Sequence, residues 1–107
     1  MATETSKPPT PVVQSGIVTY GQNNTGWTLN SGSGERTFTG KVDFPASFSG
    51  TPTVTVALAG IDASPQSGAV RLRVAPSVAN QSSFDLAITT WDDSQVYNVW
   101  GSWLAYR

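Results

Sequence analysis

Hydrophobic and polar residues alternate along this chain from Val12 onward, and no stretch keeps a helical period. Successive side chains of a β-strand point to opposite faces, so the alternation predicts strands that each have one apolar face. Segments rich in Gly, Asn, Ser and Pro separate the alternating runs and predict turns. We therefore expect an all-β fold, a six-stranded antiparallel β-sandwich with strands at approximately 14–20, 35–44, 52–61, 68–77, 83–91 and 95–106.

The length of 107 residues fits one domain with one hydrophobic core. Residues 1–12 are polar and rich in proline, and we expect them to form a disordered leader before a domain at 13–107. This leader contains no apolar segment of the kind found in a secretory signal. The expected location is therefore the cytoplasm or, after non-classical export, the cell exterior, and the leader could equally be a linker from a longer protein.

The charge and the residue types exclude several classes of function. The net charge is −1 and the Lys and Arg residues are scattered, whereas a nucleic-acid surface needs clustered cations. No apolar run approaches the roughly 20 residues that a membrane-spanning helix needs. The chain lacks both Cys and His, which removes the usual nucleophile–base pairs and the nitrogen and sulfur ligands of zinc. We expect no nucleic-acid partner, no membrane insertion, no cofactor and no metal, although a calcium ion at Asp92 and Asp93 stays open as a weakly signalled alternative.

The alternation also predicts which strands pair. A hairpin between 68–77 and 83–91, with both apolar sets on one side, places Arg71 opposite Thr89. A second hairpin between 83–91 and 95–106 places Thr90 opposite Tyr97. Under this pairing three side chains converge at one end of neighbouring strands, beside the turn at 92–93: Arg71, Trp91 and Tyr97.

This predicted cluster has the groups that hold a sugar. An aromatic ring stacks on the apolar face of a sugar, and charged groups make strong hydrogen bonds to its hydroxyls. Asp92 and Asp93 are poor catalytic carboxylates, because neighbours on an extended chain point apart and a glycosidase pair stands about 5–9.5 Å apart across the sugar. The plainer alternatives are a turn pair for the two aspartates and a solvated strand residue for Arg71.

Three tryptophans have different predicted roles. Trp103 shares the parity of the buried set and is assigned to the core. Trp27 follows a turn and is expected to pack over one end of the sandwich. Trp100 shares parity with Asn98 and Ser102, away from the core, and a large exposed aromatic residue usually marks an interface. We favour contact with another subunit over contact with a ligand for Trp100.

From Gln14 to Tyr106 the chain resembles the H-type lectin family, which includes snail agglutinins and the C-terminal domains of discoidins. The segments that carry the resemblance are VQSGIVTYG…TGW, PTVTVALAGID, GAVRLRV, SSFDL and TWDDSQVYNVWGSWLAY. The last of these is the most specific, with an aromatic residue, an acidic turn and Val-Tyr followed by Ser-Trp-Leu-Ala.

The resemblance implies a non-enzymatic lectin that assembles as a homotrimer and binds glycans near subunit boundaries, particularly galactose-type sugars and N-acetylgalactosamine. By position, Arg71 matches the sugar-binding arginine of the family, and Trp91 and Tyr97 match two aromatic contact positions. Asp92 occupies a contact position where the snail agglutinin has histidine. Glu35 is a loose candidate for an acidic contact from the loop between the first two strands, which is shorter here.

The leading hypothesis is thus a trimeric lectin that acts on extracellular glycans. A second hypothesis is a trimerising structural, adhesion or host-recognition module without a functional sugar site. A third is a glycoside hydrolase or its carbohydrate-binding appendage, and the absence of histidine and of spaced carboxylates disfavours the enzyme.

Overall fold

The computed structural model describes residues 11–64 and 67–107 and shows six β-strands. The strands are β1 (Val13–Gly21), β2 (Arg36–Asp43), β3 (Thr53–Ser64), β4 (Arg73–Ala79), β5 (Ser83–Thr90) and β6 (Gln95–Tyr106). Most of the expected leader at 1–12 lies outside the described residues, so the domain boundary stays a prediction. In the described part of the chain, no helix has the length and hydropathy needed to span a bilayer.

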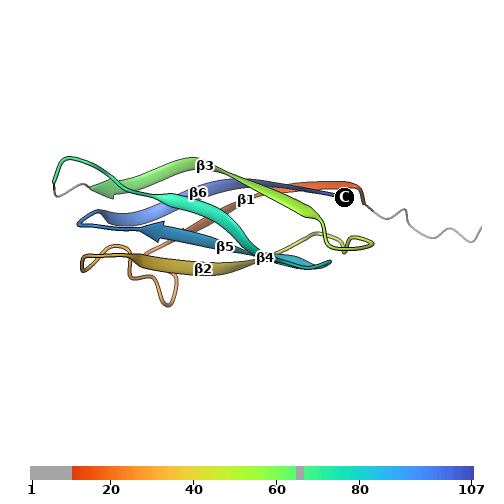
Figure 1. Cartoon of the computed structure of the whole chain (residues 1–107), viewed down its shortest axis with the longest axis horizontal. Helices are drawn as coiled ribbons and strands as arrows, with labels where there is room; N and C mark the ends of the chain where they lie inside the picture. The colour runs from red at the N-terminus through yellow and green to blue at the C-terminus, as the bar shows by residue number, and fades with distance from the viewer. Residues whose placement is uncertain (1–10, 65–66) are drawn as a thin grey trace, which may run out of the picture.

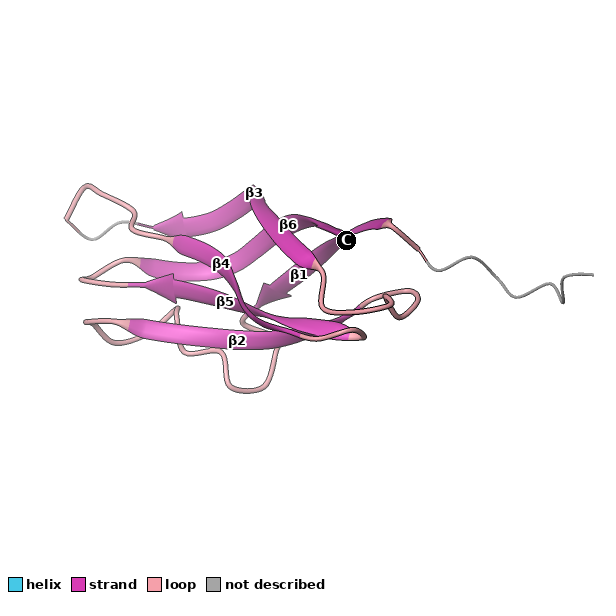
Figure 2. Cartoon of the chain, turned by 45° about the vertical axis from the view of Figure 1, so that its right-hand side comes forward, coloured by secondary structure: helices cyan, strands magenta, loops and turns pink. Residues whose placement is uncertain are grey.

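The strands form two antiparallel three-stranded sheets, which confirms the predicted sandwich. One sheet has the order β1-β6-β3 and the other β2-β5-β4 (Figures 1 and 2). Only β4 and β5 are consecutive strands within one sheet, so every other connection crosses between the two layers.

The predicted pairing of the fifth and sixth strands is wrong. The chain leaves β5 at Thr90 and enters β6 in the opposite sheet, so Tyr97 is not a ladder partner of Thr90. Both strands turn an apolar face to the same core, and alternation alone cannot distinguish a hairpin from a crossing between two facing sheets. The predicted register of the other hairpin is also shifted, because Arg73 and not Arg71 faces Thr89. A register shift of two residues keeps every side chain on the same face of its strand, so the alternation of the sequence cannot reveal it.

The core lies between the two sheets, and alternate side chains of β5 and β6 point into it. Phe84, Leu86 and Ile88 of β5 are fully buried. The Phe84 ring stacks on Phe44, with centroids 5.7 Å apart, and meets the Trp103 ring of β6 edge-on at 5.6 Å. The core assignment of Trp103 is confirmed.

Trp27 closes the core near one end of the sandwich, as expected. Its ring lies 5.1 Å from the ring of Phe38, and its indole N–H donates a hydrogen bond of 2.9 Å to the carbonyl of Val96. Three connections gather at this end, on the left of Figure 1: β1–β2, β3–β4 and β5–β6. The strands therefore bring residues from distant parts of the sequence to one rim.

Candidate functional site

An arginine–aspartate pair lies at the rim where the three connections meet. Nη1 of Arg71 is 3.4 Å from Oδ2 of Asp92, and the two side chains are 32% and 60% exposed. Nη1 is itself shielded from solvent, and no described residue accepts a hydrogen bond from it. The contact is therefore an ion pair without hydrogen-bond geometry, and it leaves a guanidinium donor without an acceptor.

The backbone of Arg71 is fixed by two buried hydroxyl groups. Its N–H donates to Oγ of Ser94 at 2.9 Å, and its carbonyl accepts from Oγ1 of Thr90 at 2.7 Å. Ser94 in turn donates to the carbonyl of Ala69 at 3.2 Å. Because Thr90 and Ser94 are fully buried, these bonds tie the segment before β4 firmly to the β5–β6 turn.

Asp92 occupies this turn in a left-handed conformation, with φ of 61°. Aspartate tolerates this region better than most residues because its short side chain bonds locally. The Asp92 carbonyl accepts hydrogen bonds from the Gly34 N–H at 2.9 Å and from Nη2 of Arg36 at 3.0 Å. The neighbouring Asp93 carboxylate accepts from the Ser67 hydroxyl at 2.9 Å. The turn interpretation of the two aspartates is thus correct, and Asp92 is also available at the surface.

Arg73 is a rim residue that the sequence reasoning missed. It was not part of the predicted cluster, but its guanidinium carbon lies 5.8 Å from the centre of the Trp91 ring, within cation–π range. The available signal was its position two residues after Arg71 on a strand predicted to pair beside Trp91. Arg73 therefore covers part of the indole that was predicted to face a ligand.

Tyr97 lies near the same end of the sandwich but in the other sheet. The β3–β6 register shifts between Asp62 and Ala63, which leaves Tyr97 as the extra residue of a β-bulge. Its carbonyl accepts from the Gln22 N–H at 2.9 Å. The predicted ladder that would have joined Tyr97 to the Arg71 cluster does not form, so its membership of the cluster rests on its place at this end alone.

Glu35 is exposed immediately before β2 and directly follows Gly34, whose N–H donates to the carbonyl of Asp92. Glu35 is therefore the sequence neighbour of a residue that contacts the turn at Asp92. In the described part of the chain, no group of three Asp or Glu side chains is placed to hold a metal ion.

A model of the H-type lectin domain matches residues 39–106, which is more than half of the chain. The chain belongs to the H-type lectin family. The matched region of this H-type lectin includes four of the five predicted sugar contacts, whereas Glu35 precedes it.

Individual relatives agree with this assignment. Discoidin-2 of Dictyostelium discoideum is 34% identical over 89 residues, which cover 83% of this chain and 33% of discoidin-2. The structure of recombinant discoidin II from the same organism matches with a TM-score of 0.80 and 32% identity over 87% of this chain and 35% of the other. The structure of wild-type discoidin II matches with a TM-score of 0.81 and 30% identity, over 100% of this chain and 39% of the other. The H-type lectin chain thus spans little more than a third of the length of these relatives.

The outer face of the β1-β6-β3 sheet is a second notable surface of this H-type lectin. Trp100 points outward with 39% of its surface exposed, as predicted, and its indole lies against Gly60 of β3, where an added Cβ would approach the ring to 3.2 Å. Ile17, Leu104 and Tyr106 are also exposed, from β1 and β6. The sheet therefore presents large apolar side chains to its surroundings.

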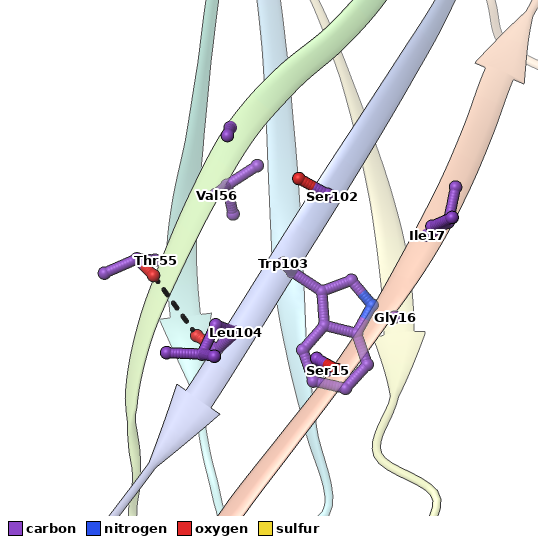
Figure 3. A pocket seen from close by; sticks show the side chains of 9 residues that line it. Ser15, Gly16, Ile17, Thr55, Val56, Ser102, Trp103 and Leu104 are labelled. Carbon is purple, nitrogen blue, oxygen red and sulfur yellow. Dashed lines mark hydrogen bonds between the residues drawn. The ribbon is translucent and has the colours of Figure 1, made fainter.

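An open groove of about 650 Å³ crosses the middle of this face (Figure 3). Its nine lining residues are all uncharged: Ser15, Gly16, Ile17, Thr55, Val56, Ala57, Ser102, Trp103 and Leu104. The groove does not coincide with the rim around Arg71. Since polar hydroxyl-rich ligands need charged or strongly polar partners, the rim suits a sugar better, and the apolar face suits protein contact.

Proposed function

We propose that this chain is a carbohydrate-binding lectin domain whose site is the rim around Arg71 and Asp92. The observation that carries the proposal is the partly exposed guanidinium of Arg71, which stands beside the exposed carboxylate of Asp92. Sugar hydroxyls donate and accept at once, so an adjacent fixed donor and acceptor match them.

The other rim residues would complete the contact. Trp91 supplies an aromatic surface for the apolar side of the ring, on the part of the indole that Arg73 leaves free. Tyr97 and Glu35 are proposed as further contacts from the neighbouring sheet and loop. The proposed ligand is a galactose-type sugar, including N-acetylgalactosamine.

The interactions of Asp92 and Asp93 fit a site that binds a sugar without catalysis. Asp92 is paired with Arg71, and Asp93 accepts a hydrogen bond from Ser67. Adjacent aspartates in a turn do not provide the opposed acid and base that glycoside hydrolysis requires.

Several copies of the site on one assembly would make weak binding useful. A single shallow site of about millimolar affinity contributes only about 4 kcal/mol. A homotrimer that joins through the outer face of the β1-β6-β3 sheet would present three sites, and such linkage raises avidity by roughly 10²–10⁴. The uncharged groove and the exposed Trp100 support this assembly.

A glycan array on the intact chain tests the function. We expect retention on glycans with terminal galactose or N-acetylgalactosamine and competition by the free sugar. An array without any bound glycan, together with a stable oligomer in solution, would contradict the proposal and favour a structural or adhesion module.

The apolar outer face favours that module as the second candidate, and it leads to a prediction. Trp100→Ala should shift the assembly toward monomers, because removing a large aromatic residue from an interface costs about 2 kcal/mol or more. Light scattering at several protein concentrations measures the shift. Val78→Ala, which truncates an exposed residue of β4 in the other sheet, is the control and should keep the native mass. A Trp100→Ala protein with the native mass at every concentration would refute this interface.

A further inference from the structure

Arg36 is the first residue of β2, and among the residues that the structure describes its side chain donates hydrogen bonds only to backbone carbonyls. Five bonds are made by its side chain: Nε to Gly34 at 2.9 Å, Nη1 to Ser31 at 2.8 Å and Leu29 at 3.5 Å, and Nη2 to Asp92 at 3.0 Å and Ser94 at 3.1 Å. An arginine side chain has five N–H donors, so the count of bonds matches its full capacity.

These bonds join two segments that are far apart in the sequence. Three of the acceptors belong to the β1–β2 loop and two to the β5–β6 turn. Two further bonds support the same junction: Gly34 N–H to the Asp92 carbonyl at 2.9 Å, and Nε2 of Gln95 to the Gly32 carbonyl at 3.0 Å. The loop and the turn therefore behave as one unit around the guanidinium.

The junction acts most directly on Asp92. A left-handed backbone costs a non-glycine residue roughly 1–2 kcal/mol, so this conformation persists only where the surroundings hold it. The Asp92 carbonyl receives two donors, one from Arg36 and one from Gly34. Because the backbone conformation fixes the direction of the Cα–Cβ bond, these bonds also set where the Asp92 side chain leaves the turn, beside Arg71.

We propose that Arg36 is a positioning residue that holds Asp92 in the orientation needed for sugar binding. The inference rests on the proposed function, and it adds a residue that touches no sugar itself. The planar fork of arginine reaches both segments at once. Lysine has a single ammonium group and cannot reproduce this pattern.

Sugar affinity of an Arg36→Lys variant tests the inference. We expect about tenfold weaker binding of N-acetylgalactosamine, in the range of coupling between residues that share a network, with the domain still folded by its amide NMR spectrum. Exchange of the Gly34 amide hydrogen should be faster, since its bond to Asp92 belongs to the same junction. Arg107→Lys is the matched control: Arg107 bonds to the carbonyl of Thr51 at 3.3 Å, at the opposite end of the sandwich, and its replacement should leave affinity unchanged.

Two further variants separate the possible causes. Asp92→Ala should weaken binding, and adding Arg36→Lys to it should weaken binding no further, because the positioned group is already gone. Native affinity in Arg36→Lys or in Asp92→Ala, or additional loss in the double variant, would overturn the positioning role. If Arg71→Ala binds the sugar with native affinity as well, the proposed site itself is wrong. If Arg71→Ala loses binding while Arg36→Lys keeps native affinity, the site stands and only the positioning role of Arg36 is wrong.

Discussion

Replacing Phe84 with alanine should lower the free energy of unfolding by about 3–5 kcal/mol, the cost typical of removing a buried phenylalanine. Phe84 is 1% exposed and contacts aromatic rings on both sides, Phe44 in stacked and Trp103 in edge-on geometry. Because Phe84 belongs to β5 and Trp103 to β6, the cavity would open between the two sheets. Urea unfolding at one fixed protein concentration measures the loss, since assembly makes stability depend on concentration.

Replacing an exposed apolar residue with alanine is the control for Phe84→Ala. Val78→Ala removes two methyl groups from a residue that is 62% exposed, and it should change stability by no more than about 0.5 kcal/mol. Equal losses in the two variants would contradict the assignment of Phe84 to the core.

Arg71→Ala is expected to reduce sugar binding below detection and to leave the fold and the oligomer intact. A hydrogen bond to a charged group contributes about 1.5–3 kcal/mol, which is a large part of the roughly 4 kcal/mol available to a millimolar site. The effect on stability should be small, because the side chain is partly exposed and its ion pair with Asp92 lacks hydrogen-bond geometry. Amide NMR titration with N-acetylgalactosamine measures binding, and thermal unfolding measures stability.

Lys41→Ala removes the same charge from a different place. Lys41 lies on β2, where it forms an exposed pair with Asp43 at 3.7 Å. Its replacement should leave sugar affinity unchanged. A loss of binding in both variants would point to net charge instead of the Arg71 site.

Much of the fold could be predicted because burial in a strand follows parity. Trp103 and Trp100 lie on opposite faces of β6, each on the side that alternation assigned to it. These positions depend only on which face of the strand meets the core. The sandwich architecture, the inward Trp103 and the exposed Trp100 were therefore accessible from the sequence.

The arrangement of the rim was less accessible, because it depends on crossings, bulges and loop contacts. Parity did not reveal that β5 and β6 lie in different sheets, nor that Tyr97 sits at a bulge. Arg36 was missed for a related reason. It bonds to backbone carbonyls, which every residue has, so the residue types do not reveal these contacts. Arg71 and Asp92 were nevertheless brought together as predicted, by Ser94 and Thr90 instead of the predicted register.

The titration of the native protein with N-acetylgalactosamine tests the central claim most directly, because it locates the sugar. The amide signals that move should belong to the rim, in residues 69–73 and 91–97, and the Arg71→Ala protein should show no such change. Movement confined to the groove on the β1-β6-β3 face, at residues 15–17, 55–57 and 102–104, would contradict the claim, as would native-like binding by Arg71→Ala.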